Sequence, residues 1–368
     1  MTIFESIEKP TLLIDSDKVK QNIQRMCQKA KDQNIRFRPH FKTHQSAEIG
    51  EWFRQEGVTA ITVSSLDMGR YFADHGWQDI TLAFPVNIRQ VLGIASLAQQ
   101  IHLEILVESI ETVRFLEANL PETLDVWIKV DAGSHRTGLA WDEPQALGSL
   151  ANAIQTSGHL KLRGLLTHAA QTYKANSPAE VRQVYSESIG RMHQARYSLA
   201  DQGFNGLEVS VGDTPGCSLC DNLGEVDELR PGNFVFFDAQ QCALGSCRAE
   251  NIAVAVACPV VAKHPERQEA VIYGGAIHLS KVALPEDGQM IYGKIALPEG
   301  AGWGNPLPGA YMARISQEHG VVHMPVHDLD RLHIGDLLCV LPVHSCLTVQ
   351  VMGEYLTLAG EVISTMGC

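Results

Sequence analysis

Short apolar stretches alternate with segments of helical periodicity along the first two-thirds of the chain. Between most of the apolar stretches, hydrophobic residues recur at a period near 3.6, as in residues 179–202. Eight strand–helix units over roughly 200 residues predict a (β/α)8 TIM barrel, an α/β fold, with an open doubly wound sheet as the alternative. The expected strands are residues 36–42, 60–65, 79–84, 102–109, 125–132, 162–169, 207–212 and 233–239.

The pattern changes after about residue 245, where helical periodicity fades. Short apolar runs alternate there with turns rich in Gly and Pro, such as residues 297–309. We therefore expect a barrel over residues 12–245 and a C-terminal all-β domain over residues 246–368, which residues 1–11 and the run 11–15 can join. The expected strands of the second domain include residues 270–273, 340–342 and 347–352.

Composition narrows the classes of function. The chain has 368 residues, 45% of them hydrophobic, and a formal net charge of −13. Such an acidic chain is poorly suited to nucleic acid or to anionic membranes. The longest apolar run, residues 252–262, is too short to span a bilayer. No signal-peptide pattern is visible and the nine cysteines are an odd number, so we expect a cytoplasmic protein with free thiols.

Cations and histidines gather in the motif Arg-Pro-His-Phe-Lys-Thr-His, which covers residues 38–44. A lysine at the carboxyl end of a barrel strand lies on the catalytic face. Nearby cations and partial burial would lower the pKa of Lys42, which Schiff-base formation near neutral pH requires. The alternative, a solvated loop in which Thr43 caps the next helix, is about as probable from spacing alone.

Two further segments leave strands toward the same face of the expected barrel. Residues 129–138 contain Arg136 after a turn with glycine, and residues 165–173 place His168 at the end of an apolar run, followed by Tyr173. Each residue taken alone is more often structural than catalytic. Their shared position at the carboxyl ends of strands favours a catalytic role over a structural one.

A third group of segments resembles an anion-binding edge. Residues 210–216, Ser-Val-Gly-Asp-Thr-Pro-Gly, end a strand in small residues whose backbone N–H groups can bind phosphate, although the same letters also suit an ordinary turn. Arg230 and Gly232 follow in residues 228–232.

His344 and Cys346 alternate in residues 341–348. If this segment is a strand, both side chains point to one side and offer two ligands for Zn²⁺. The alternative is an apolar strand with a buried thiol and no metal.

Two other patterns are expected to carry no chemistry. Cys217 and Cys220 form a lone C-x-x-C without a second such pair, so we expect unpaired structural thiols. His319, His323 and His327 recur every four residues, but the neighbouring valines and Pro325 favour strand and turn over a helix.

Taken together, these segments resemble the fold-type III pyridoxal-phosphate enzymes, specifically the D-threonine aldolase and D-serine dehydratase group of the alanine-racemase-like superfamily. The resemblance covers nearly the whole chain, and its most specific motif is residues 38–44. It implies pyridoxal 5′-phosphate as cofactor, held covalently by Lys42. It also implies Zn²⁺ or another divalent metal on His344 and Cys346, and a homodimer. The other cofactor-binding residues that it implies are Arg136, His168, Tyr173, Ser210, Gly212, Thr214, Arg230 and Gly232.

The resemblance implies a lyase that acts on small D-3-hydroxy amino acids, by dehydration or by aldol cleavage. Lys42 would take the α-proton in dehydration. In aldol cleavage, His168, His40 or a zinc-bound water would be the base that deprotonates the β-hydroxyl. A cysteine in the His-x-Cys pair favours the dehydratase. An amino-acid racemase and a non-catalytic pyridoxal-phosphate carrier remain alternatives. The chain departs from the family pattern at residues 273–281 and at Val343, so the substrate can differ from D-serine and D-threonine.

Overall fold

The computed structural model describes residues 3–367, and it divides into two compact units. The barrel unit comprises Arg25–Lys42 and Gly50–Gly232. The sheet unit comprises the stretch that ends at Gln24, the short segment Thr43–Ile49 and the stretch that begins at Asn233. Among residues 3–367, none of the helices combines the length and apolar character that crossing a bilayer requires.

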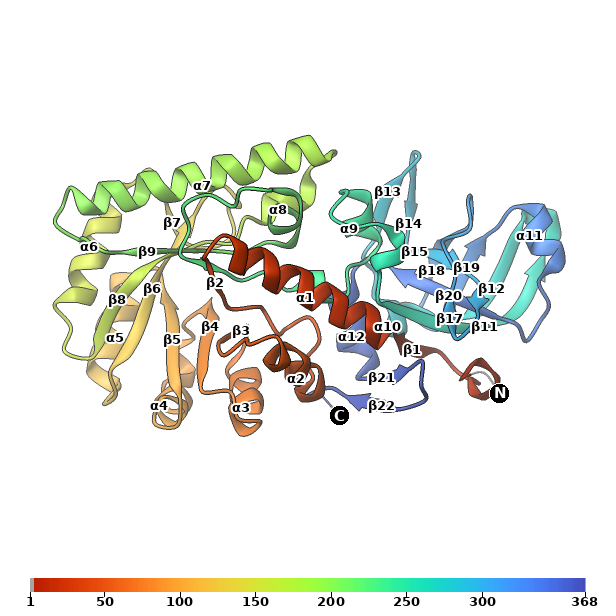
Figure 1. The fold of residues 1–368 in the computed structure, drawn as a ribbon, viewed down its shortest axis with the longest axis horizontal. Helices are drawn as coiled ribbons and strands as arrows, with labels where there is room; N and C mark the ends of the chain where they lie inside the picture. The colour runs from red at the N-terminus through yellow and green to blue at the C-terminus, as the bar shows by residue number, and fades with distance from the viewer. Residues whose placement is uncertain (1–2, 368) are drawn as a thin grey trace. The chain divides into compact units, whose positions relative to one another are not determined.

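The barrel unit contains parallel strands side by side (Figure 1) that close into a ring, which confirms the predicted fold. The strands follow the order β2-β10-β9-β8-β6-β5-β4-β3. A parallel bridge between His40 and Thr62 closes the ring, with the Phe41 N–H donating to the Thr62 carbonyl at 2.9 Å. The strands are β2 (Arg36–Phe37), β3 (Ile61–Val63), β4 (Asp79–Pro85), β5 (His102–Val107), β6 (Leu124–Asp131), β8 (Leu160–Leu166), β9 (Glu208–Val211) and β10 (Glu228–Leu229), and β7 (Leu139–Ala140) pairs with β6.

Helices follow most of these strands, as the alternating pattern predicts. Ser65, Ser109 and Ser177 each cap the next helix by accepting a backbone N–H, which satisfies a donor that the first turn leaves unpaired. The long helix α7 (Pro178–Ala200) matches the expected helix at residues 179–202. The other helices are α3 (Leu66–Asp74), α4 (Val91–Ala98), α5 (Ile110–Asn119), α6 (Pro144–Gln155) and α8 (Thr214–Leu219), and α1 (Ser16–Asp32) and α2 (Ala47–Gln55) each contribute to both units.

The expected eighth strand at residues 233–239 is wrong. Residues Asn233–Val235 form a 3-10 helix, and the eighth strand is the shorter β10. The prediction failed because Phe234 to Phe237 are all apolar, and such a run occurs in buried turns as well as in buried strands. β10 contains the charged Glu228, so it lacks the apolar signature of a barrel strand.

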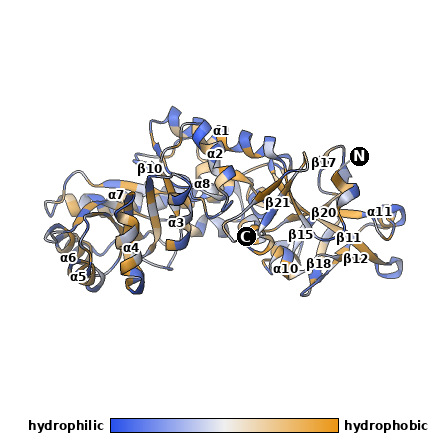
Figure 2. Cartoon of the chain, turned by 90° about the horizontal axis from the view of Figure 1, so that it is seen from below, coloured by the Kyte–Doolittle hydropathy of each residue, from blue (hydrophilic) through white to orange (hydrophobic). Residues whose placement is uncertain are grey.

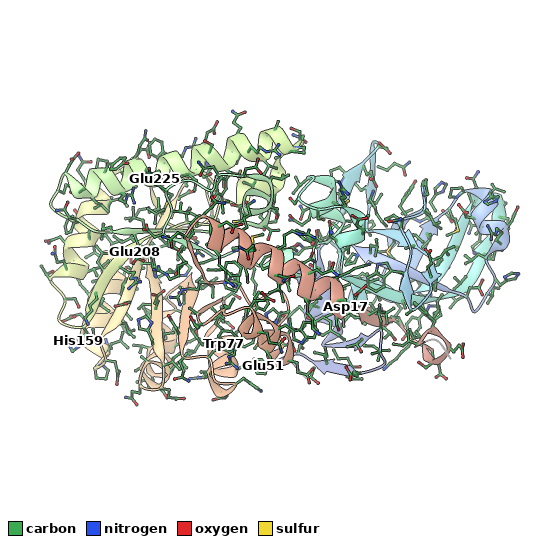
Figure 3. The ribbon with its side chains drawn as sticks, in the orientation of Figure 1. Asp17, Glu51, Trp77, His159, Glu208 and Glu225 are labelled. Carbon is green, nitrogen blue, oxygen red and sulfur yellow. The ribbon has the colours of Figure 1, made fainter. Side chains whose placement is uncertain are left out.

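A buried carboxylate joins the strands inside the barrel. The side chain of Glu228 is inaccessible to solvent, and its Oε2 accepts from Arg38 Nε at 2.7 Å and from Arg36 Nε at 2.8 Å. Its Oε1 accepts from Ser210 Oγ at 2.7 Å. Arg36 also pairs with Glu208 at 2.5 Å, which is labelled in Figure 3. Strands β2, β9 and β10 are therefore held together by one ionic network.

Arg38 extends this network to the neighbouring strands. Its Nη1 lies 2.6 Å from Asp79 Oδ1 and its Nη2 lies 3.4 Å from Glu104 Oε1. Asp79 accepts from His102 Nδ1 at 2.9 Å, and His102 Nε2 reaches Asp125 at 3.1 Å. The motif at residues 38–44 groups Arg38 with Lys42 as neighbouring cations. The structure instead buries its guanidinium among carboxylates at the amino ends of β4 and β5.

The sheet unit contains a closed antiparallel barrel of six strands with three strands attached. The ring follows the order β12-β19-β18-β15-β20-β11, and β11 pairs back to β12. Figure 2 shows hydrophobic colouring along β11 and β20, and the apolar run at residues 252–262 lies largely within β11. The strands are β1 (Thr11–Ile14), β11 (Val254–His264), β12 (Glu269–Tyr273), β15 (Gly293–Ala296), β18 (Tyr311–Ile315), β19 (His319–His323), β20 (Leu337–Pro342), β21 (Glu354–Thr357) and β22 (Val362–Ser364).

Smaller elements complete the sheet unit, and one of them corrects an expectation. The expected strand at residues 347–352 is wrong, because these residues lie in helix α12 (Ser345–Met352). The β-branched Thr348 and Val349 are buried on that helix, so tertiary packing outweighs their preference for strands. The remaining elements are the hairpins β13 (Leu284–Glu286) with β14 (Gln289–Ile291) and β16 (Pro298–Glu299) with β17 (Gly302–Trp303), and the helices α9 (Ala239–Ala243), α10 (Ala276–Leu279) and α11 (Val326–Arg331).

The two compact units divide the chain differently from the expected domains 12–245 and 246–368. Strand β1 pairs antiparallel with β11 and parallel with β21, so it belongs to the sheet unit. Residues 43–49 and the stretch from Asn233 also belong there. The expected boundaries remain a prediction about which residues fold together.

The network around Arg38 predicts a large loss of stability when this residue is replaced. In Arg38→Met, the buried carboxylates of Glu228 and Glu104 each lose the fully buried one of their cations, which costs about 3–5 kcal/mol of unfolding free energy. Urea unfolding measures this loss. Arg70→Met is the control, because the Arg70–Asp67 pair is exposed and contributes about 1 kcal/mol or less. Equal stabilities of the two variants would contradict the assignment.

The same network predicts a pH dependence of stability at its exposed end. Hydrogen bonds to Asp125 and Asp79 raise the pKa of His102 from 6.5 to about 10. The charged form is therefore favoured in the folded state, and its contribution is fully present below pH 6.5 and lost as the pH rises through 10. His102→Gln should lower the unfolding free energy at pH 6 and have a smaller effect at pH 10. A larger effect at pH 10 would contradict this sign.

Candidate active site

Lys42 lies at the carboxyl end of β2, beside a residue that fixes the backbone. Phe41 is fully buried, and its ring lies 4.9–5.0 Å from those of Phe53, Phe72 and Trp77 (Trp77 is labelled in Figure 3). The Lys42 N–H donates to His40 Nδ1 at 3.3 Å. Burial of Phe41 therefore orients its neighbour. The expected partial burial of Lys42 is wrong, because its side chain is exposed.

Arg230 is a buried cation close to the Lys42 end of the barrel interior. Its Nε donates to Ser210 Oγ at 2.6 Å, and its Nη2 donates to the carbonyls of Thr167 at 2.5 Å and Ser210 at 3.3 Å. Burial lowers the pKa of Arg230 to about 10, so its guanidinium stays charged at neutral pH. These hydrogen bonds fix the plane of the guanidinium.

Lys129 is a residue that the sequence analysis did not assign. It is 4% exposed, and its Nζ donates to the Val130 carbonyl at 3.0 Å. Burial, followed by the nearby charges of Arg230 and Arg136, lowers its pKa to about 8. The available signal was a lysine between Ile128 and Val130 in β6, since a buried lysine on a barrel strand needs a partner.

His168 lies among these cations as a neutral imidazole. Burial lowers its pKa to about 3, and the charges of Lys42, Arg136 and Arg230 act in the same direction. Its Nδ1 contacts the Gly212 carbonyl, which can only accept, so Nδ1 carries the hydrogen and Nε2 is an acceptor. The charges of Lys42, Arg136 and Arg230 all act on His168, so these three cations lie in its neighbourhood.

Tyr173 and Thr214 form the neighbouring part of the site. The Tyr173 ring centre lies 6.0 Å from that of His168, and its hydroxyl accepts the Thr214 backbone N–H at 3.2 Å. Asp213, which the sequence analysis did not assign, caps α8 by accepting the Gly216 N–H and also accepts from Thr172 Oγ1 at 2.8 Å. Burial raises the pKa of Asp213 to about 6.

The structure gives Ser210 and Gly212 clear packing roles. The Ser210 hydroxyl is buried between Glu228 and Arg230, and it connects these two charged groups by hydrogen bonds. A Cβ on Gly212 would lie 2.6 Å from the Arg230 backbone carbonyl carbon, so only glycine permits this approach. Ser210 is therefore better described as a residue that positions Arg230.

The loop that carries Arg136 is shaped by Asp131. The Asp131 carboxylate accepts the backbone N–H groups of Gly133, Ser134 and His135 at 2.8–3.1 Å. Arg136 itself is exposed at the end of this loop. Gly232 is the last residue of the barrel unit, one residue after the Pro231 carbonyl that accepts the His40 N–H at 2.9 Å.

The donor set at this end of the barrel suits an anionic carbonyl compound. The cations Lys42, Arg136 and Arg230 all act on His168, and Arg136 and Arg230 also act on Lys129, which the carboxylates of Asp131 and Glu108 influence in the opposite direction. A primary amine can bond covalently to a carbonyl carbon, and the fixed cations can hold phosphate or carboxylate groups. A phosphorylated aldehyde such as pyridoxal 5′-phosphate fits these residues.

His344 and Cys346 come together in the sheet unit, but not as strand neighbours. Strand β20 ends at Pro342, and His344 immediately precedes helix α12, so the expected strand geometry is wrong. The two side chains nevertheless interact directly. Cys346 Sγ lies 3.3 Å from Thr43 Oγ1 and 3.7 Å from Asn233 Nδ2.

Asp238 supports this pair, and the sequence analysis did not assign it. Its buried Oδ2 lies 3.6 Å from His344 Nδ1 and accepts the Ser345 N–H at 3.0 Å and Asn233 Nδ2 at 2.7 Å. His344 Nδ1 is buried without a hydrogen bond at ordinary distance. Burial lowers the pKa of His344, but Cys346 and Asp238 outweigh this effect and raise it to about 11.

An imidazole, a thiol and a supporting carboxylate are a donor set typical of zinc. A carboxylate at Nδ1 leaves Nε2 for a metal, and a thiol sulfur becomes a strong ligand once deprotonated. A second cluster, Asp79, His102 and Glu104, also brings three ligand atoms within 4.8 Å of one another. The Asp79 and Glu104 carboxylates already pair with Arg38, so that cluster is better explained by the ionic network.

The structure also places the two patterns that were expected to carry no chemistry. Cys217 and Cys220 are buried free thiols, and burial raises the pKa of Cys220 to about 11. His319 and His323 lie in strand β19, whereas His327 lies in helix α11. Within residues 3–367, these histidines form no group that could hold a metal.

Family models match most of the chain. The model described as "Alanine racemase, N-terminal domain" matches residues 14–240, and the one described as "Putative serine dehydratase domain" matches residues 253–358. The chain is 28% identical to D-threo-3-hydroxyaspartate dehydratase from Delftia sp., over 97% of this chain and 95% of that protein. It is 26% identical to D-serine dehydratase from Dictyostelium discoideum, over 95% and 93% of the two chains.

Solved structures agree with this likeness. The Delftia D-threo-3-hydroxyaspartate dehydratase superposes with a TM-score of 0.91 at 27% identity, covering 99% of both chains. Two further structures are variants of a D-threo-3-hydroxyaspartate dehydratase, each with a TM-score of 0.90 and 27% identity over 99% of this chain and 99% or 96% of the variant. One variant replaces a cysteine by alanine and is titled as the metal-free form. The other replaces a histidine by alanine two positions earlier.

The environment of His168 predicts that its imidazole stays uncharged from pH 5 to pH 9. Its pKa of about 3 lies below this range, so its ring nitrogen resonances should not shift with pH. Imidazole NMR of the wild type measures this, with His168→Gln to assign the signal. A His168 signal that titrates between pH 5 and pH 9 would show that the surrounding cations do not act as described.

Proposed function

Because the chain belongs to the family defined by the alanine racemase N-terminal domain, with a putative serine dehydratase domain after it, we propose that it is a pyridoxal-phosphate-dependent lyase. Its substrates are D-3-hydroxy amino acids. The observation that carries the proposal is the exposed amine of Lys42 at the carboxyl end of a barrel strand, coupled to His168 and near Arg136 and Arg230.

The barrel unit supplies the residues that hold the cofactor. Lys42 would hold it covalently, and Arg136, Arg230 and His168 would line its site, with Tyr173, Thr214, Gly212 and Gly232 at the same end of the barrel. When bound, the cofactor would supply an electron-withdrawing ring for the bond that breaks at the substrate α-carbon. Arg230 is a permanent cation in a fixed plane, so a basic nitrogen facing it is disfavoured from taking a proton.

Proton transfer falls to Lys42, His168 and His40. Lys42 takes the proton from the α-carbon once its amine is free. His168 is neutral, and its Nε2 can accept a proton because Nδ1 donates to the Gly212 carbonyl. His40 Nδ1 accepts the Lys42 N–H, so its remaining nitrogen carries the hydrogen when the ring is neutral. His168 therefore offers an accepting ring nitrogen, but its pKa of about 3 makes the imidazole a weak base.

We also propose that His344 and Cys346 bind a divalent metal, with Zn²⁺ as the best match to one imidazole and one thiolate. A Lewis acid weakens the bond to the β-hydroxyl of a hydroxy amino acid. Support comes from the dehydratase variants, in which a histidine and a cysteine two positions apart were replaced, the cysteine variant being titled metal-free. His344 and Cys346 have the same spacing.

Dehydration is the preferred reaction. Both full-length relatives described above are named dehydratases, and the pair of ligands contains cysteine. Aldol cleavage is the second candidate, because it uses the same cofactor and the same β-oxygen. Racemization does not use the metal pair, and a carrier needs no pair of ligands. A homodimer and a cytoplasmic location are further predictions of this assignment.

A panel of D-amino acids tests the proposal. The holoenzyme is assayed with D-threo-3-hydroxyaspartate, D-serine and D-threonine, with and without a metal chelator, for keto acid, aldehyde and L-enantiomer. We expect keto acid and ammonia, suppressed by chelator and restored by Zn²⁺. Aldehyde with glycine would establish the aldolase instead. Formation of the L-enantiomer in the presence of chelator, or no reaction with any substrate, would overturn the proposal.

The position of Asp238 behind His344 predicts an effect on metal affinity that can be measured without an activity assay. Asp238→Asn removes the negative charge behind His344 while keeping the side-chain shape, so affinity for Zn²⁺ should fall by about 10–100-fold. Competition with a chromophoric chelator measures the affinity. Asp330→Asn, an exposed carboxylate in α11, is the matched control. Equal affinities of the two variants would show that Asp238 does not support the metal pair.

A further inference from the structure

Two cysteines meet at the end of helix α9, outside the groups assigned above. The helix ends in a Schellman motif, in which the Gly245 N–H donates to the Cys242 carbonyl at 3.0 Å and the Ser246 N–H donates to the Gln241 carbonyl at 2.9 Å. Gly245 has a φ of +78°, which reverses the chain direction. The reversal brings Cys247 back to Cys242, and the two thiols share a hydrogen bond.

The two thiols differ in their chemistry. The hydrogen bond from Cys247 lowers the pKa of Cys242 to about 7, and Lys294 adds to this effect. The same hydrogen bond and burial raise the pKa of Cys247. Cys242 is therefore the thiol of the pair that loses its proton near neutral pH, and Cys247 is the hydrogen-bond donor beside it. Both side chains are partly exposed, so small molecules can reach them.

The other described cysteines lack this combination. Cys27, Cys217, Cys220, Cys258 and Cys339 are buried, and burial raises the pKa of each thiol. Cys346 is partly exposed, but it belongs to the proposed metal pair. Among residues 3–367, the pair at the end of α9 thus combines a reactive thiolate, an adjacent second thiol and solvent access.

We propose that Cys242 and Cys247 are a redox modification site, at which a peroxide converts the two thiols into a reversible disulfide. The Cys242 sulfur attacks one peroxide oxygen, the O–O bond breaks, and the leaving hydroxide takes a proton to become water. The Cys247 sulfur then attacks the resulting sulfenic sulfur. The S–O bond breaks, a second water leaves with the Cys247 proton, and the S–S bond forms. The two thiols lose two electrons, and hydrogen peroxide gains them.

Backbone contacts connect this site to Asp238. The Cys242 N–H donates to the Asp238 carbonyl at 3.0 Å, and the Cys247 sulfur accepts a backbone hydrogen bond at Asp238. The Gln240 N–H also reaches the Val343 carbonyl at 3.3 Å. Oxidation would join the side chains of Cys242 and Cys247, and both of these residues contact the backbone of Asp238. We therefore expect disulfide formation to lower the Zn²⁺ affinity. This consequence depends on the proposed metal pair, whereas disulfide formation does not.

The experiment treats the full-length protein with hydrogen peroxide at neutral pH and follows intact mass and peptide maps. We expect a product lighter by two hydrogen atoms, with Cys242 and Cys247 in one crosslinked pair, and full reversal by dithiothreitol. Cys247→Ser should instead accumulate a sulfenic acid on Cys242 that dimedone traps. Cys220→Ser is the matched control and should react like the wild type.

Several results would overturn the proposal. They are oxidation that leaves Cys242 and Cys247 as thiols, a crosslink that involves other cysteines, or dimedone labelling that ignores Cys242. The wild-type mass measurement stands even if a serine variant fails to fold. A disulfide that forms without any change in Zn²⁺ affinity would reject the coupling to Asp238 and keep the redox site. Loss of the proposed lyase activity in the panel would leave the disulfide result unaffected.

Discussion

The barrel unit depends on a carboxylate that has no access to water. Burying Glu228 without partners would cost several kcal/mol, so the strands around it must supply cations and a hydroxyl. Arg36 and Arg38 of the β2 segment and Ser210 of β9 do so. Because Ser210 then accepts from Arg230, the same network fixes a cation near Lys42. Stability at one end of the barrel and chemistry at the other end thus share one chain of hydrogen bonds.

Asp238 has a comparable position in the sheet unit. It is fully buried, caps α9 through the Gln241 N–H and holds the start of α12 through the Ser345 N–H. His344 immediately precedes α12 and lies close to Asp238. This explains why its imidazole and the Cys346 thiol stay close without a strand to align them. In both units, a buried acid that needs partners determines where the reactive side chains lie.

Sequence patterns predicted the features that depend on residues close together in the sequence. Seven of the eight expected barrel strands overlap observed ones, and the motif at residues 38–44 placed Lys42 at a strand end. Partnerships between distant residues were not predictable. The hydrogen bond between Ser210 and Glu228 could not be predicted, because 18 residues separate the two. From its own segment, Ser210 resembles a phosphate ligand. Asp238 went unassigned because its partner Ser345 lies 107 residues away. The charged strand β10 was missed because its carboxylate is satisfied only in the closed barrel.

The central claim is that Lys42 holds pyridoxal 5′-phosphate covalently, and an absorption spectrum of the purified protein tests it most directly. We predict a band at about 410–430 nm that Lys42→Ala abolishes. Lys161→Ala, an exposed lysine on β8, should retain it. Borohydride reduction should then attach the cofactor to the peptide that contains Lys42. A band that survives in Lys42→Ala, or a reduced cofactor attached to another lysine, would contradict the account.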